Sequence, residues 1–189
     1  MRRPQQSRSE QSAERMLDAA AALLEDGGLA AVTVAAVADR AGTSNGSLYH
    51  RFGDRAGLVR ALHERSFTAM LEETAAAFRD ADALTDDEEA ARHLAEAALA
   101  IFGRHRAALR AFLVEVADDP AVEARNAEVT ASIRAVVVDW LVRRFGASPA
   151  GAEDAFALLY ALGASQALVG PTTMTPGAVA TAVLALSRR

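Results

Sequence analysis

Residues 33–52, TVAAVADRAGTSNGSLYHRF, limit the possible folds of this chain more than any other stretch. Four apolar residues recur at the three- and four-residue spacing of one helical face: Val34, Val37, Ala38 and Ala41. Gly42 follows that face, where the end of a helix favours a residue that tolerates positive φ. Leu48 and Phe52 then form a second short apolar face. The spacing predicts two short helices joined by a turn of about three residues, the helix-turn-helix plan.

The polar residues of the same stretch agree with this plan. The hydroxyls of Thr33 and Ser44 can cap the two helices, because each can accept a hydrogen bond from an unpaired backbone N–H. Ala38 and Leu48 fit the crossing between the helices. The side chains left pointing elsewhere can all hydrogen-bond: Ser44, Asn45, Ser47, Tyr49, His50 and Arg51. Such a short, polar, neutral-to-basic face suits the major groove of DNA. Two ordinary surface helices with a polar rim are the alternative.

The segment 41–62, AGTSNGSLYHRFGDRAGLVRAL, resembles the signature of the tetracycline-repressor (TetR) family of one-component transcription regulators. The resemblance depends on Leu48, Tyr49, Phe52, Arg55 and Leu58. Arg51 and Arg55 differ from the residues commoner in the family at these places, but they keep or add positive charge. The resemblance implies an all-α fold of about nine helices. Residues 1–53 would form a three-helix DNA-binding head, and residues 54–189 a helical effector-binding and dimerisation body.

The resemblance also implies roles for single residues. Phosphates would be held by Thr33, Tyr49, His50 and Arg55, partly through helix N-termini. Ser44, Asn45 and Ser47 would face base edges, with Asn45 suited to adenine. Arg51 lies on the same short helix and adds positive charge to its surface. The implied partners are a double-stranded operator, a small-molecule effector and a second copy of the chain.

The net charge of −5 does not exclude DNA binding, because the charge is unevenly distributed. Residues 1–60 contain eight arginines against seven acidic residues, whereas residues 61–189 contain twelve against eighteen. Arg2, Arg3 and Arg8 form a basic N-terminal segment. We expect residues 1–6 to be a mobile arm that either reaches a minor groove or has no role.

Composition favours a helical chain without disulfides. The 189 residues are 51% hydrophobic and contain no cysteine, so they suit one or two small domains. The longest near-apolar run, residues 155–170, is shorter than the roughly 20 residues that a membrane helix needs. The first twelve residues lack the apolar core of a secretory signal. We therefore expect a cytoplasmic protein with no membrane contact.

Apolar periodicity and helix-breaking residues place further helices along the chain. The predicted ranges are 9–25 and 55–80, a helix from the loop 81–88 to about 103, then 105–117, 120–145, 149–169 and 177–187. The last two of these helices carry small and apolar faces, which favour a two-fold dimer interface. Completion of a single-chain core is the alternative.

The body is expected to enclose an apolar or weakly polar effector. Candidate contacts are Phe102, Phe112, Asn126, Ile133 and Trp140. Asn126 is a polar group in an apolar stripe, and a hydrogen bond to neighbouring backbone or water explains it as well as a ligand does.

No catalytic, cofactor or metal site is predicted. Glu89, His93 and Glu96 share a helical face, but they lie in a charged run that a solvated surface explains better. The chain has neither a phosphate-binding glycine loop nor a nucleophile elbow. A helical binding module without DNA activity, and a helical enzyme of unfamiliar type, are the competing classes.

Overall fold

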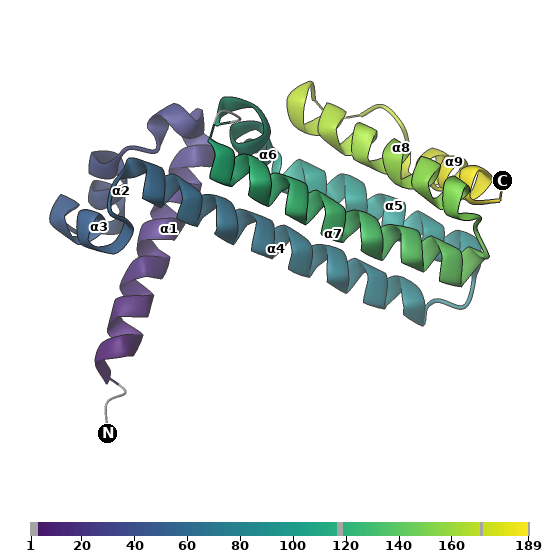
Figure 1. Cartoon of the computed structure of the whole chain (residues 1–189), viewed down its shortest axis with the longest axis horizontal. Helices are drawn as coiled ribbons and strands as arrows, with labels where there is room; N and C mark the ends of the chain where they lie inside the picture. The colour runs from purple at the N-terminus through teal and green to yellow at the C-terminus, as the bar shows by residue number, and fades with distance from the viewer. Residues whose placement is uncertain (1–3, 117–118, 171, 189) are drawn as a thin grey trace. The chain divides into compact units, whose positions relative to one another are not determined.

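The computed structural model describes residues 4–116, 119–170 and 172–188, with side chains from residue 9 onward. Every regular element in these residues is helical (Figure 1), so the predicted all-α class is confirmed. The helices are α1 (Pro4–Ala31), α2 (Val34–Ala41), α3 (Asn45–Phe52), α4 (Arg55–Ala83), α5 (Asp87–Arg104), α6 (Arg106–Arg110), η1 (Ala111–Glu115), α7 (Pro120–Phe145), α8 (Pro149–Leu168) and α9 (Pro176–Ser187). In the described part of the chain, no helix combines the length and apolarity needed to cross a bilayer.

Packing divides the chain into two compact units, which we call unit 1 (Met1–Ser66) and unit 2 (Phe67–Arg189). The division falls inside α4, which contributes its first turns to unit 1 and the remainder to unit 2. The predicted functional division after residue 53 stays a prediction, because compactness does not show what each part binds.

The helical segment α1 extends beyond the predicted range, although its regular helix breaks at the two predicted glycines. The glycines that were expected to end it, Gly27 and Gly28, form a kink with Gly28 at φ 68°, and helical structure then resumes as far as Ala31. At the other end α1 begins at Pro4, so the expected mobile arm is wrong for residues 4–6. Residues 1–3, with Arg2 and Arg3, and the side chain of Arg8 lie outside the described residues.

Unit 1 is held together by apolar side chains from all four of its helices. The most buried are Ala20, Val32, Val37, Leu48, Leu58 and Leu62. Leu48 is only 2% exposed, as expected for a side chain that fills the crossing between α2 and α3. Burying a leucine of this kind stabilises a fold by about 1.5–3 kcal/mol, so the sequence's apolar faces account for the assembly of this unit.

Unit 2 is built from helices lying side by side, with α8 and α9 packed on one another and on α5 (Figure 1). Its core surrounds Trp140, which is 1% exposed. The indole ring meets Phe78 and Phe145 edge-on, and its N–H donates to Asp82 Oδ1 at 2.6 Å. The buried aromatic ring therefore keeps its one polar group satisfied.

The segment after α6 departs from the expected regular helix. Residues 111–115 form η1, a π-helical turn in which Val116 N–H donates to Ala111 O, five residues back, at 3.1 Å. Asn126 Nδ2, from α7, donates to Phe112 O at 2.8 Å. The helix predicted over about 105–117 is therefore present from 106 to 115, but its second half is π-helical, and apolar periodicity could not reveal the wider turn.

Candidate functional site

The junction of α2 and α3 has the geometry that its sequence predicted. Thr33 Oγ1 accepts from Ala36 N–H at 3.1 Å and caps α2. Gly42 ends that helix in the left-handed region, with φ 62° and ψ 42°. Ser44 Oγ accepts from Ser47 N–H at 3.2 Å and caps α3. The predicted helix-turn-helix is therefore confirmed, and each of its caps is made by the residue expected to make it.

The outer face of α3 is open within unit 1. Tyr49 is 54% exposed, and the other candidates on this face are also exposed: Asn45, Ser47, His50 and Arg51. The hydroxyls of Ser44 and Ser47 lie 3.0 Å apart and can share a hydrogen bond. Thr33 is exposed at the start of α2. The face thus presents donors and acceptors on a short helix that can approach another molecule closely.

A polar hollow lies beside this face, between the start of α1 and α3. Its lining combines hydroxyl, imidazole and guanidinium groups from Ser9, Ser12, Ser44, Ser47, His50 and Arg51. Groups of this kind hydrogen-bond phosphate oxygens. The serines of α1 were not among the predicted site residues, because helical periodicity does not reveal which turn of α1 lies next to α3.

Arginines of unit 1 differ in how far they are already neutralised. Arg40 pairs with Asp26 at 2.6 Å, and Arg65 pairs with Asp18. Arg51 makes no ion pair within the described residues. Its guanidinium is therefore a cation on the α3 face that an external anion could meet without competition.

Arg55 has a contact that the sequence did not suggest. Its Nε donates to Val32 O and its Nη2 to Leu29 O, both at 2.8 Å. Leu29 lies in the last turn of α1 and Val32 directly follows the helix, where carbonyls carry a partial negative charge. Arg55 was predicted to hold a phosphate, and in unit 1 it ties the start of α4 to the end of α1. Its remaining N–H donors leave the phosphate contact a prediction.

Sequence comparison agrees with the geometry of unit 1. Residues 16–62 match the family model described as bacterial regulatory proteins, tetR family. That range covers most of α1, all of α2 and α3, and the first turns of α4. No curated protein matches the chain in sequence.

Solved structures share the fold of almost the whole chain. A TetR-family transcriptional regulator from Mesorhizobium loti superposes with a TM-score of 0.80 at 16% identity, over 95% of this chain and 96% of that one. A transcriptional regulator from Rhodococcus sp. Rha1 gives 0.69 at 24% identity, over 94% and 92%. The multidrug-binding protein EbrR, complexed with imidazole, gives 0.65 at 21% identity, over 93% and 94%.

Fold and motif together define a helix-turn-helix DNA-binding transcriptional regulator. The family that the chain resembles over residues 16–62 is the TetR family of bacterial regulatory proteins. The expectation drawn from Leu48, Tyr49 and Phe52 is thereby confirmed.

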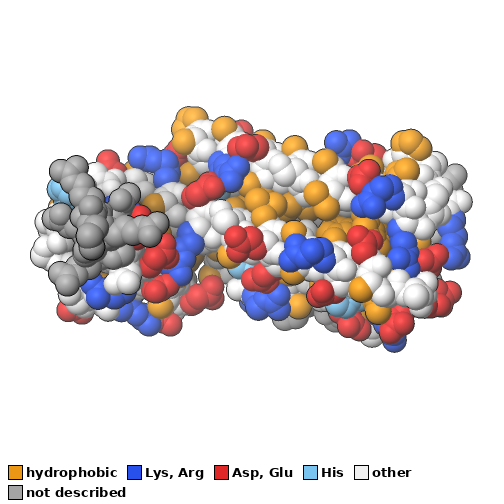
Figure 2. Space-filling view, turned by 90° about the horizontal axis from the view of Figure 1, so that it is seen from below, with side chains coloured by type: hydrophobic (Ala, Val, Ile, Leu, Met, Phe, Trp, Pro, Cys, Tyr) orange, Lys and Arg blue, Asp and Glu red, His pale blue; other side chains and the backbone are white. Residues whose placement is uncertain are grey.

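Unit 2 contains an apolar cavity of about 120 Å³ that is partly open to solvent. On the face seen in Figure 2, hydrophobic side chains gather in a hollow of unit 2 that is flanked by charged residues. Of the predicted effector residues, Phe102, Ile133 and Trp140 line the cavity. Phe112 does not line it and is fully buried against Phe67, with ring centroids 6.3 Å apart. Asn126 does not line it either.

Sequence reasoning missed several cavity residues, including Phe67, Phe78, Thr130, Phe156 and Tyr160. Those on α4 and α8 belong to apolar faces that were visible in the sequence. Periodicity shows which side of a helix is buried, but it does not show which buried residues border an empty space. The effector roles of all five predicted residues stay predictions.

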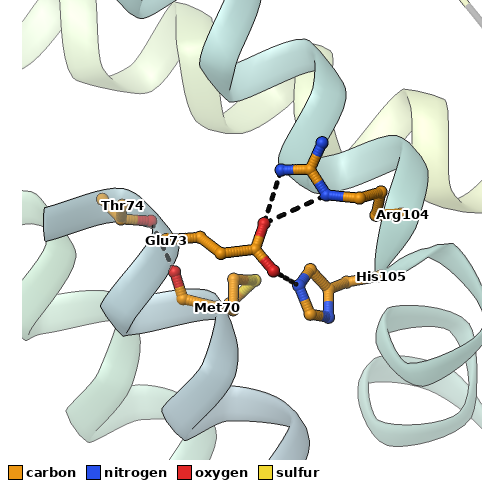
Figure 3. Close-up of polar contacts among 5 residues, drawn as sticks. All are labelled: Met70, Glu73, Thr74, Arg104 and His105. Atoms are coloured by element: carbon orange, nitrogen blue, oxygen red, sulfur yellow. Dashed lines mark hydrogen bonds and ion pairs between the residues drawn. The ribbon is translucent and has the colours of Figure 1, made fainter. Parts of the chain in front are cut away.

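Next to the cavity, a polar cluster joins α4 to the end of α5 (Figure 3). Glu73 accepts from Arg104 Nε at 3.1 Å and Nη2 at 2.5 Å, and its other oxygen lies 2.9 Å from His105 Nε2. Burial by itself raises the pKa of the Glu73 carboxyl, but the hydrogen bonds and charges of Arg104 and His105 together outweigh it and lower that pKa. We call these three residues the ion-pair cluster, because they join α4 to the end of α5 through ion pairs and hydrogen bonds.

The side chains considered for metal binding do not come together into a site. Among the residues that the structure describes, no three histidine or acidic side chains come together as metal ligands would. Glu89, His93 and Glu96 lie on the same helix, α5, but they are not part of such a cluster.

Proposed function

We propose that α3 enters the major groove of an operator and that the protein represses transcription until a small apolar effector releases it. The observation that supports this most is the exposed polar face of α3, with Arg51 unpaired in the described residues beside it. A short helix with capped ends and a polar outer face suits close approach to base edges.

The proposed DNA contacts are of two kinds: contacts to phosphates position the protein on the duplex, and contacts to bases distinguish one sequence from another. Thr33, Tyr49, His50 and Arg51 hold phosphates, and the free donors of Arg55 add to them. Ser44, Asn45 and Ser47 face bases, with the Asn45 amide bidentate on adenine. The hydrogen bond that the Ser44 and Ser47 hydroxyls can share at 3.0 Å would orient both groups before DNA binds.

A homodimer on a near-palindromic operator accounts for the exposed apolar residues of the C-terminal helices. Tyr160 is 40% exposed and Leu168 44% exposed, both on α8. The adjoining Val169 is 82% exposed. A two-fold interface through α8 and α9 would cover them and place two copies of α3 on successive turns of DNA.

The effector binds in the apolar cavity of unit 2 and changes the position of α4, whose residues contribute to both units. It acts because it binds the released state more tightly than the operator-bound state. In this proposal the protein regulates transcription and catalyses no reaction. Turnover of a substrate in the absence of DNA would contradict it.

The test is a gel-shift on the DNA upstream of the protein's own gene, with the wild type and two single variants. Asn45→Ala should relax the preference at one base pair by about 1–3 kcal/mol. Arg51→Ala should weaken binding to all sequences alike and reduce the salt slope by about one. An Asn45→Ala protein with unchanged base preference would show that the base contact is assigned to the wrong residue.

A further inference from the structure

The walls of the cavity in unit 2 carry no charge. Its described lining consists of aliphatic and aromatic side chains with a few hydroxyl groups, and it includes no aspartate, glutamate, arginine or histidine. An ionised group placed inside would lose its hydration with no counter-charge to replace it. The cavity therefore favours a neutral occupant.

The space is the size of one ring. The cavity volume is about 120 Å³, and an apolar cavity of roughly 150 Å³ can hold benzene. One wall is fixed by Phe102, whose ring fits against Gly163 so closely that a Cβ there would lie 2.2 Å from it. The rings of Phe67, Phe78 and Trp140 offer faces and edges to an aromatic occupant.

Two hydroxyl groups on the wall have no hydrogen bond within the described residues: that of Tyr160, whose side chain is 40% exposed to water, and that of Thr130, which is only half-buried but less exposed. A threonine inside a helix often donates to the carbonyl four residues back, as Thr74 does to Met70 O at 2.8 Å (Figure 3). Thr130, on α7, makes no hydrogen bond within the described residues. The indole N–H of Trp140 is already bound to Asp82. The Thr130 hydroxyl is thus available to a polar atom of a ligand.

We propose that the cavity binds a neutral single-ring aromatic molecule whose one polar group hydrogen-bonds the Thr130 hydroxyl. This inference rests on the proposed function, in which unit 2 takes the effector, and it names the chemical class. Benzyl alcohol has the required ring and hydroxyl, toluene lacks the hydroxyl, and benzoate replaces it with a charge.

The full chain carries its own reporter, because Trp140 is its single tryptophan and lines the cavity. We would titrate the protein with each of the three probes and follow tryptophan fluorescence and calorimetric heat. Benzyl alcohol should bind at least 100-fold more tightly than benzoate, since only the carboxylate must lose its charge or its hydration.

Thr130→Val is the matched variant, because valine keeps the shape of the side chain and removes only the hydroxyl. It should weaken benzyl alcohol roughly five- to tenfold, as expected for one hydrogen bond, and change toluene binding less than twofold. Equal binding of benzoate and benzyl alcohol, an equal effect of Thr130→Val on benzyl alcohol and toluene, or no binding by either method would each overturn the inference.

A gel-shift with the same probes separates this inference from the proposed function. If benzyl alcohol binds as described but leaves the operator complex intact, the ligand class holds and the effector role fails. If no probe binds and the operator complex still forms, the ligand class fails and the DNA-binding role stands.

Discussion

Replacing Arg55 by alanine should destabilise unit 1 rather than only weaken DNA binding. The side chain donates to the carbonyls of Leu29 and Val32, both at 2.8 Å, across more than twenty residues of sequence. It therefore joins the end of α1 to the start of α4. The variant removes both bonds, but Leu29 O keeps its bond from Val32 N–H at 3.1 Å and only Val32 O is left to water.

The expected loss follows from these two bonds. A hydrogen bond from a charged donor contributes about 1.5–3 kcal/mol net, and the lower end applies here because Arg55 is exposed to water. Since water can hydrate the freed carbonyl of Val32, the full penalty for burying it does not arise. We expect the free energy of unfolding to fall by about 2–3 kcal/mol in Arg55→Ala. Arg55→Lys should recover less than half, because an ammonium group lacks the planar fork.

Urea unfolding of the full chain, followed by far-ultraviolet circular dichroism, measures this loss. Arg51→Ala is the control, because Arg51 is exposed and makes no ion pair in the described residues. It should change stability by less than about 0.5 kcal/mol while reducing operator affinity. If Arg55→Ala unfolds at the wild-type urea concentration and behaves like Arg51→Ala on DNA, its contacts to α1 contribute nothing and its main role is on phosphate.

Two further changes test other contacts. Gly57→Ala should cost more than about 2 kcal/mol in the same unfolding assay, since its Cβ would lie 1.9 Å from Phe52 O; Gly46→Ala, whose Cβ would meet nothing closer than 3.8 Å, should be neutral or stabilising. Glu73→Gln should cost about 1 kcal/mol at pH 7, a small value because Glu73 is 35% exposed. Because the folded-state pKa of Glu73 is lowered, its stabilisation is complete above the ordinary value of about 4.3 and is lost as the pH falls through the lowered one. Unfolding curves of Glu73→Gln and wild type should therefore converge as the pH falls below the lowered pKa of Glu73, and a difference that stays constant with pH would contradict the ion-pair cluster.

Local signals in the sequence predicted the DNA-binding helices well. The caps at Thr33 and Ser44, the left-handed Gly42 and the buried Leu48 are all short-range consequences of residue type. Each depends on residues that are only a few positions apart in the chain, so the local sequence is enough to predict it. The range 120–145, with a proline at its start and a glycine after its end, was predicted for the same reason.

Contacts between distant segments were not predictable in this way. The reach of Arg55 back to Leu29, and the close approach of Gly57 to Phe52 O, depend on how helices meet. The cavity is likewise a gap left by side chains from several helices, and no single helical face reveals it. Phe112 illustrates the limit, since it had the same apolar signal as Phe102 yet packs in the solid part of the core.

The π-turn over residues 111–115 holds one more residue per turn than the helix before it. Deleting a single residue there would let an ordinary helix form without moving either flank by a full turn. The carbonyl of Phe112, which accepts a hydrogen bond from Asn126 Nδ2, would then accept from a backbone N–H of the ordinary helix instead. This stretch is where chains of the same architecture can differ by one residue in length, and a structural alignment of them should place its gap here.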